Sequence, residues 1–275
     1  MQDLLIFLPT LFMLLAIGAF AGILAGLLGV GGGIVLVPAF YYAFSGLGYD
    51  NPQLMQICVA TSLATIVFTS IRSVLSHNKK GLVEWSILKS WAPGIMFGAM
   101  IAVFVAAKLP SNTLTIIFGI LGFFLGVYMA VSGSDWHIAD KMPTGVSRGV
   151  LSSMIGFLSV LMGVGGGSFA VPTMTLHKIK IHKAVATAAG FGLAIAFPSA
   201  IGFLITEPPM LGKPPMTIGY VNIPAFLVII SMTMITAPMG AKLAHKLNVK
   251  TLKRVFALFL ILVASNMLRE AFWVN

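Results

Sequence analysis

The feature that most constrains the fold of this chain is its series of long apolar segments. Segments such as 112–132 are long enough for an α-helix to cross the hydrocarbon core of a bilayer. Of the 275 residues, 58% are hydrophobic and only 9% are charged, whereas a typical soluble domain has about 25% charged residues. The sequence therefore predicts an all-α, polytopic membrane protein.

Polar and proline-containing stretches divide the chain into ten apolar segments. We expect these to form about eight full transmembrane helices together with shorter, glycine-broken arms. A polar linker, residues 134–147, separates a first transmembrane repeat, 1–133, from a second, 148–275. The apolar segments fall at about 4–28, 32–47, 53–76, 83–107, 112–133, 149–164, 167–176, 184–206, 219–244 and 252–272.

The two halves share a glycine-rich motif. GLLGVGGGIVLVP at 26–38 matches VLMGVGGGSFAVP at 160–172 at eight of thirteen positions. The tripeptide Val-Ala-Thr at 59–61 likewise recurs at 185–187. Because order and spacing are kept, an internal duplication is the sensible interpretation, as in many transporters.

The distribution of Lys and Arg predicts that the repeats are inverted. If 148–177 enters the membrane and returns, 14 of the 17 basic residues lie on the side of loop 77–81. Only Lys108, Lys213 and Arg269 then lie on the other side. A single crossing by 148–177 would divide the basic residues 8 to 9. Because cytoplasmic loops retain Lys and Arg, we expect the first arrangement, with both termini outside a bacterial inner membrane.

Residues 148–176 are too few for two full crossings. They provide about 14 residues each way, whereas a full helical crossing takes roughly 20. The sequence therefore predicts two short helices joined at the glycines, and a longer first arm in the first repeat. Pro38 and Pro172 are interpreted as structural parts of the two breaks. The start, Met1-Gln2-Asp3, lacks a basic region and indicates that the first segment is retained.

Consecutive glycines at a helix break leave backbone amides that lipid cannot pair. At the start of a new helix such amides accept an anion, helped by the positive end of the helix dipole. The alternative is that the glycines only allow close packing, as the pair Gly22 and Gly26 is expected to do. The duplication favours a binding site. Its predicted substrate-binding glycines are Gly29, Gly31, Gly32, Gly33, Gly163, Gly165, Gly166 and Gly167.

Four hydroxyl residues near the breaks are further candidates for substrate contact. Thr61 and Ser62, and the matched Thr187, lie in the helix that follows each break. Ser168 follows the second glycine run, where the first run has Ile34. The alternative for each hydroxyl is a hydrogen bond back to its own helix.

The charged residues favour an anionic substrate over a cation. All seven Asp and Glu residues fall at segment ends or in loops, whereas a cation site or proton relay normally needs a carboxylate within the membrane. Arg72 either extends to the headgroups or forms an anion entrance. The net charge of +10 is attributed to cytoplasmic loops and not to nucleic-acid binding.

Catalytic and metal-binding patterns are missing from the sequence. It has neither HExxH nor GxSxG, and its histidines lie in basic loops. The single cysteine, Cys58, excludes an intramolecular disulfide. We therefore expect no catalytic residue, no metal site and no cofactor.

Taken together, these motifs resemble the TauE/SafE sulfite exporter family, also called TSUP. The resemblance rests on the duplicated GxGGG…VP element, on ATSLATI at 60–66 with its weaker echo ATAAGFG at 186–192, and on GYVNIPAF and APMGAKLAHKL within 219–247. By position, the family's glycine breaks map to the glycines named above. Its TSL element maps to Thr61-Ser62-Leu63, and Ala188 replaces the serine in the second copy.

The resemblance covers nearly the whole chain and implies a secondary transporter, often an exporter, of small sulfur-containing anions such as sulfite, thiosulfate or sulfoacetate. An interior-negative potential favours anion export by about 2.3 kcal/mol per charge per 100 mV. The alternatives are an anion channel, a permease for another small solute, and a membrane scaffold. The expected partners are the anion and the lipid bilayer, and a homo-oligomer is left open.

Overall fold

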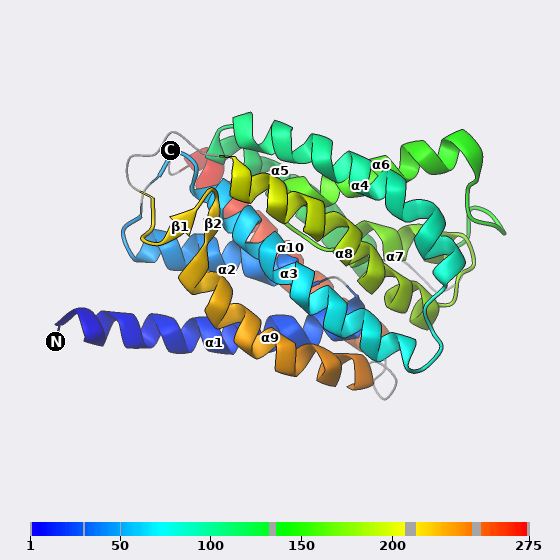
Figure 1. Ribbon diagram of the computed structural model, residues 1–275, viewed down its shortest axis with the longest axis horizontal. Coiled ribbons are helices and arrows are strands. Elements are labelled where there is room, and N and C mark those ends of the chain that lie inside the picture. Colours follow the sequence, from blue (N-terminus) through cyan, green and yellow to red (C-terminus); the bar gives the residue numbers. More distant parts are fainter. Residues whose placement is uncertain are drawn as a thin grey trace.

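The protein, seen in a computed structural model, is described over residues 2–29, 31–49, 51–131, 136–206, 213–243 and 249–273. These residues contain ten α-helices and one two-stranded antiparallel sheet (Figure 1). The elements are α1 (Gln2–Leu28), α2 (Gly33–Gly46), α3 (Leu54–Asn78), α4 (Trp85–Lys108), α5 (Ser111–Val131), α6 (Gly145–Leu161), α7 (Gly167–Leu176), α8 (Ile181–Ile205), β1 (Thr217–Ile218), β2 (Val221–Asn222), α9 (Ile223–Leu243) and α10 (Val249–Trp273).

The helices confirm an all-α, polytopic membrane protein. Within the described ranges, six helices are long and apolar enough to cross a membrane: α3, α4, α5, α8, α9 and the part of α10 over 256–273. This is fewer than the eight or so full spans expected from the sequence. The difference arises because α6 ends after 17 residues and the apolar part of α1 found among the described residues is Leu11–Leu27.

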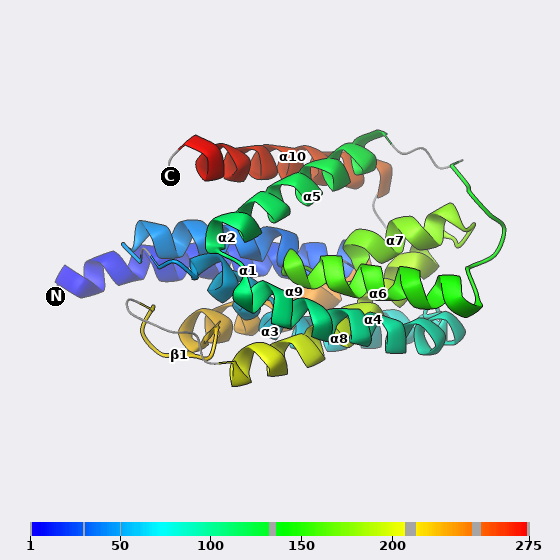
Figure 2. The same ribbon diagram turned by 90° about the horizontal axis from the view of Figure 1, so that it is seen from above.

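Two helical hairpins enter the molecule from opposite ends (Figure 2). The outer ends of α1 and α2 lie at one end of the long axis, and those of α6 and α7 lie at the other. The returning arms are short, with 14 residues in α2 and 10 in α7. Because a full crossing takes roughly 20 residues, each hairpin turns back near the middle, as the sequence predicts for 148–176.

Helices α3 and α8 run antiparallel to each other through the centre (Figure 1). In the most apolar 18-residue window of α3, 83% of the residues are buried, so α3 contacts protein on nearly all sides. Around this pair, α1 packs along α9, α4 along α6, and α5 along α10. Each of these four pairs joins a helix from the first half of the chain to one from the second half.

The chain between α8 and α9 differs from the sequence prediction. The apolar segment expected at 219–244 begins as a hairpin, in which β1 pairs with β2, and α9 starts only at Ile223. Pro214 and Pro215 precede the hairpin and have no backbone N–H to donate. Gly219 has a φ of +54°, which the turn requires and which glycine adopts without strain.

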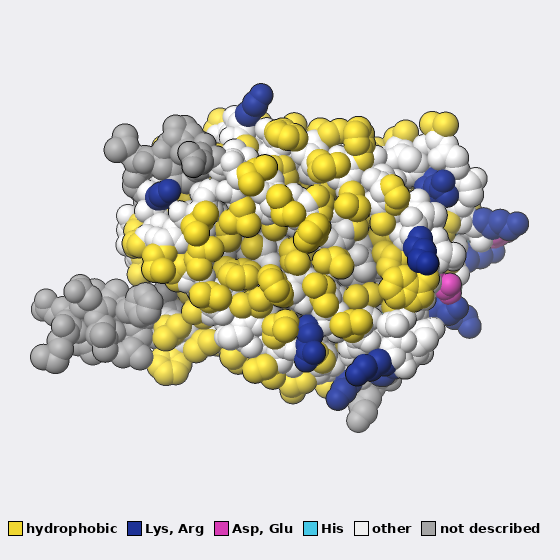
Figure 3. All heavy atoms as spheres, viewed as in Figure 1, with side chains coloured by type: hydrophobic (Ala, Val, Ile, Leu, Met, Phe, Trp, Pro, Cys, Tyr) yellow, Lys and Arg dark blue, Asp and Glu magenta, His cyan; other side chains and the backbone are white. Residues whose placement is uncertain are grey.

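The surface fits a chain whose sides face lipid and whose ends face water. Apolar side chains cover the middle of the face in Figure 3, and many Lys and Arg side chains gather toward its right-hand end. The loop between α3 and α4 lies at that end (Figure 1). This is the loop that the distribution of basic residues predicts to be cytoplasmic.

Candidate functional site

The tips of the two hairpins touch each other. A Cβ atom built on Gly33 would lie 2.3 Å from the carbonyl oxygen of Gly163 and 2.8 Å from Cα of Val164. A Cβ on Gly31 would lie 3.2 Å from Cα of Gly165. These neighbours are backbone atoms, so only glycine allows the approach. The two glycine-rich breaks, 134 residues apart at Gly29 and Gly163, are therefore in direct contact.

Each tip also packs against the valine of the repeated Val-Ala-Thr tripeptide in the other half of the chain. A Cβ on Gly29 would lie 2.4 Å from the carbonyl oxygen of Val185 in α8. A Cβ on Gly163 would lie 3.0 Å from Cα of Val59 in α3. Both glycines have positive φ, +67° and +64° respectively. The tips are thus held by the same kind of contact on both sides.

Thr61 and Thr187 each accept a hydrogen bond from the backbone next to the start of another helix. The backbone N–H of Asn222, next to the first residue of α9, donates to Thr61 Oγ1 at 3.0 Å. The backbone N–H of Glu84, next to the first residue of α4, donates to Thr187 Oγ1 at 3.0 Å. Each threonine is fully buried and joins one half of the chain to the other.

Ser62 also bridges the two halves. Its hydroxyl donates to the carbonyl oxygen of Gly163 at 2.8 Å and so supports the second tip. Ala188 stands at the matching place in the second half and has no hydroxyl to offer. A hydroxyl at this position of the repeated motif therefore supports the second tip, and its counterpart cannot support the first.

The second tip is surrounded by polar groups without partners. Ser168 is 2% exposed and Ser70 is 1% exposed, and neither hydroxyl has a hydrogen-bond partner. A Cβ on Gly192 would lie 2.4 Å from Ser70 Oγ and 3.6 Å from the backbone nitrogen of Gly166. Because Gly192 has no side chain, the Ser70 hydroxyl and the Gly166 amide can both approach the position that a Cβ atom would occupy.

Backbone amides at this tip are likewise unpaired. In the described structure, the N–H groups of Gly165, Gly166, Gly167 and Ser168 donate to no backbone carbonyl. No side chain caps the start of α7. Because these groups lie at a helix N-terminus, they form a neutral cluster of donors with a partial positive charge. Such a cluster accepts an anion.

At the first tip the N–H groups of Gly31, Gly32, Gly33 and Ile34 likewise donate to no backbone carbonyl in the described structure, but the neighbouring side chains are apolar. Ile34 and Ile66 are fully buried, and a Cβ on Gly31 would lie 3.0 Å from Ile66 Cγ2. Gly32 caps α2 in a left-handed conformation, with a φ of +80°.

The remaining residues proposed from the sequence are two prolines within helices and one arginine on the surface. Pro38 and Pro172 are inside α2 and α7, each five residues after the first residue of its helix. Each removes a backbone N–H from a short arm. Arg72 lies on the exposed face of α3, whereas Ser70 and Ser73 of the same helix are buried.

No described Asp or Glu side chain lies at the centre of the molecule, where the two glycine tips meet. Glu84 is paired with Lys183 at 2.5 Å, at the end of the molecule, and Asp140 pairs with Lys178. No group of three His, Cys, Asp or Glu that could hold a metal ion is found in the described ranges. Asp50, Asp135 and Glu207 lie outside the described residues.

The sequence reasoning missed Ser70 and Gly192. A signal for the polar character of α3 was available, because polar residues recur every fourth position along it. All five are buried, and together they form one stripe within a membrane-spanning helix. The stripe consists of Thr61, Thr65, Thr69, Ser73 and His77.

The fold and its glycine-lined centre define a polytopic membrane protein built around two broken helices. Residues 14–267 match the model of the family described as Sulfite exporter TauE/SafE. The chain belongs to the TauE/SafE sulfite exporter family, as its motifs indicate, and it is a membrane transporter.

Relatives with similar sequences are named as probable membrane transporter proteins. A probable membrane transporter protein of Haemophilus influenzae is 36% identical and covers 92% of this chain and 96% of its own length. Probable membrane transporter proteins of Methanocaldococcus jannaschii and Bacillus subtilis are 29% and 27% identical. They cover 90% and 94% of this chain, and 91% and 97% of their own lengths. No solved structure gives a significant match.

Proposed function

We propose that this protein is a secondary transporter of a small sulfur-containing anion, such as sulfite, thiosulfate or sulfoacetate, bound at the second glycine tip. The observation that carries the proposal is the pair of buried, partnerless hydroxyls of Ser70 and Ser168 beside unpaired amides. Buried polar groups without partners are costly in a protein interior. An oxyanion would pair with several of them at once.

The chemistry of these groups selects an anion over a cation. Backbone amides only donate hydrogen bonds, and a serine hydroxyl can donate one. The oxygens of a sulfite or sulfonate group accept several hydrogen bonds, and hydrogen bonds to charged groups are the stronger kind. The family description names sulfite, which is an anion with this donor requirement.

The contacts between the halves support inverted repeats, residues 1–133 and 148–275, as the moving parts. Each half contributes a hairpin that turns back at the centre, a threonine that holds the start of a helix from the other half, and a tip glycine packed on the other half's valine. Movement of one repeat against the other would expose the centre to each side in turn. Export follows from an interior-negative membrane potential, which expels anions without a coupling ion.

Sulfite flux from proteoliposomes tests the proposal. We expect saturable sulfite transport with counterflow, and a loss of roughly tenfold or more in Ser70→Ala and in Ser168→Ala, since each removes a hydrogen bond to a charged group. Ser199→Ala is the matched control, because Ser199 is also fully buried but donates to Ile195 of its own helix at 2.7 Å.

Three results would count against the proposal. Unchanged flux in both Ser70→Ala and Ser168→Ala would remove the second tip from the site. Flux that rises without saturation would identify an anion channel instead. If no sulfur anion moves at all, the assignment of the substrate class is wrong.

A further inference from the structure

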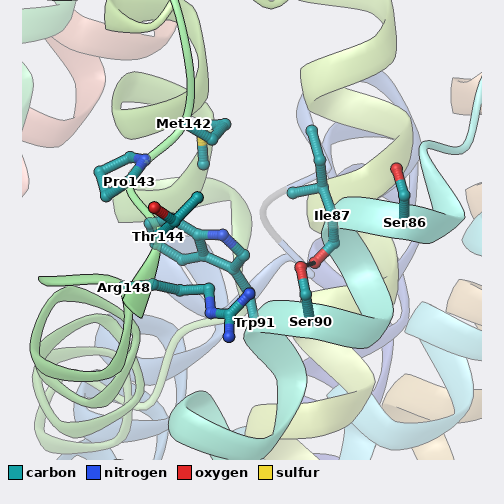
Figure 4. A pocket seen from close by; sticks show the side chains of 8 residues that line it. All are labelled: Ser86, Ile87, Ser90, Trp91, Met142, Pro143, Thr144 and Arg148. Atoms are coloured by element: carbon teal, nitrogen blue, oxygen red, sulfur yellow. Dashed lines mark hydrogen bonds between the residues drawn. The ribbon is translucent and has the colours of Figure 1, made fainter. Parts of the chain in front are cut away.

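An open surface cavity with mixed polar and apolar walls lies at the end of the molecule where α4 and α6 begin (Figure 4). Its volume is about 160 Å³. Figure 4 shows Ser86 and Ser90 of α4 on one side and Met142 and Thr144, ahead of α6, on the other. The cavity lies at the start of α6 (Gly145–Leu161), and the second glycine tip follows the end of that helix.

The polar part of the cavity carries positive charge and no carboxylate. Arg148 lines it and makes no ion pair among the described residues. Two carboxylates toward this end are already occupied, Asp140 by Lys178 and Glu84 by Lys183. The hydrogen bond from Lys178 lowers the pKa of the Asp140 carboxyl below its ordinary value. The Arg148 guanidinium is therefore available to an external anion.

Hydroxyl groups add donors around this charge. The Ser90 hydroxyl donates to the carbonyl oxygen of Ile87 at 3.1 Å, whereas Ser86 and Thr144 have exposed side chains on the cavity wall. An oxyanion in the cavity could take a bidentate contact from Arg148 and hydrogen bonds from Ser86 and Thr144. A guanidinium with neighbouring hydroxyls is suited to phosphate oxygens.

The rest of the cavity and its surroundings are apolar. Trp91 is buried and Met142 half-buried in its wall. Phe97, Ile101 and Phe104 follow Ser90 on the same face of α4, 7, 11 and 14 residues further along, and all three are exposed. This apolar stripe continues the face of α4 that carries the two serines of the cavity wall, and it runs toward the middle of the molecule. Since α4 is a candidate membrane span that begins here, the cavity lies at headgroup depth and the stripe at the depth of acyl chains.

We propose that the cavity binds the phosphate group of an acidic phospholipid, with its acyl chains along this stripe of α4. Arg148 neutralises the phosphate, and Ser86 and Thr144 donate to its oxygens. The distribution of basic residues predicts this end to be cytoplasmic, where a basic pocket at the membrane surface attracts acidic lipid. The proposal does not depend on the substrate site, because none of the groups around the glycine tips takes part.

Lipid binding to the purified full-length protein tests this proposal. The protein in neutral detergent is titrated with phosphatidylglycerol, phosphatidylcholine or inorganic phosphate, and bound lipid is counted by native mass spectrometry alongside the melting temperature. We expect phosphatidylglycerol to bind and raise the melting temperature. Phosphatidylcholine and inorganic phosphate at the same concentrations should have little effect.

Single-residue variants test whether the lipid binds in this cavity. Arg148→Gln should weaken phosphatidylglycerol binding roughly tenfold or more, since it removes a charge-assisted contact. Lys89→Gln is the matched control, because Lys89 is an exposed cation of α4 that does not line the cavity. Ser90→Phe should cause the same loss as Arg148→Gln by filling the cavity while keeping its charge.

Three outcomes would each contradict a different part of the lipid-binding proposal. Equal phosphatidylglycerol binding by the wild type, Arg148→Gln and Ser90→Phe would overturn the site. Equal binding of phosphatidylcholine would show that the negative charge is not recognised. An Arg148-dependent stabilisation by inorganic phosphate alone would replace the lipid with a free anion.

Discussion

The two glycine tips have similar geometry but different chemical surroundings. Both turn back near the centre, both begin a short helix, and they touch through backbone atoms. Around the first tip the neighbouring side chains are Ile34 and Ile66. The second tip has Ser168 in place of Ile34, and Gly192 leaves room for the Ser70 hydroxyl.

This difference teaches that a duplicated backbone need not give a duplicated binding site. At the first tip, large apolar side chains fill the space beside the glycines. At the second tip, Gly192 allows the Ser70 hydroxyl and the Gly166 amide to approach the same point. We infer that both tips present backbone amides, and that the partnerless hydroxyls of Ser70 and Ser168 add hydrogen-bond donors at the second tip.

The largest effect is expected where the tips touch. Gly33→Ala places a methyl group 2.3 Å from the Gly163 carbonyl oxygen, and backbone atoms cannot rotate out of the way. We expect destabilisation of about 1–3 kcal/mol or more from overpacking, together with loss of sulfite flux. Melting temperature in detergent and proteoliposome flux measure both effects.

Gly46→Ala is the control for that substitution. Gly46 also belongs to α2, and a Cβ there would meet nothing within 4 Å, so stability and flux should stay close to wild type. If Gly33→Ala also behaves like wild type, the tips do not make the contact that the fold assigns to them.

A more selective effect is expected at Gly192. In Gly192→Ala the new methyl group would meet Ser70 Oγ at 2.4 Å, and the serine can rotate away at low cost. We expect a melting temperature near wild type but roughly tenfold lower flux, because a hydrogen bond to the anion is lost.

Gly190→Ala is the matched control for Gly192→Ala. It lies in the same helix, and its methyl group would also meet a flexible side-chain end, that of Leu88. Its flux should be unchanged. Equal flux in both variants would remove the chemical distinction between the two tips.

The smallest effects on flux are expected from the matched threonines, whose substitution acts on stability. Thr61→Val leaves the N–H of Asn222, which is 4% exposed, without its acceptor and should cost about 1–3 kcal/mol. Thr187→Val should cost less, because Glu84 is partly exposed and water can replace the lost acceptor. Melting temperatures compare the two variants.

Thr69→Val is the reference for the threonine variants. The Thr69 hydroxyl donates to Thr65 of its own helix at 2.9 Å, so its loss leaves no N–H without an acceptor. Equal shifts in Thr61→Val and Thr187→Val would show that burial of the donor does not decide the cost.

Much of the architecture was predictable because it follows from local sequence. Apolar length located the helices to within a few residues, and the glycine runs located both tips. The duplicated motif also pointed to their association. The hairpin before α9 was missed because its residues continue an apolar segment, and Gly219 was interpreted as part of that segment.

The chemistry around the tips could not be predicted in the same way. Thr61 and Thr187 were paired from the sequence as candidates for substrate contact, whereas their bonds to Asn222 and Glu84 join elements far apart in sequence. Likewise, Ser70 approaches the second tip only because α8 offers Gly192 at that height. Such contacts depend on the packing of α3 against α8, which no local pattern specifies.

The glycine tips have a consequence for how specificity can evolve. A backbone amide is the same in every residue except proline, so substitution within a tip cannot retune its donors, and the close contacts leave little room for other side chains. Preference for one anion over another would therefore change through the helices next to the tip, at positions such as Ser70, Ser168 and Gly192. In the site that we propose, the tip is the inherited part and its neighbours are the adjustable part.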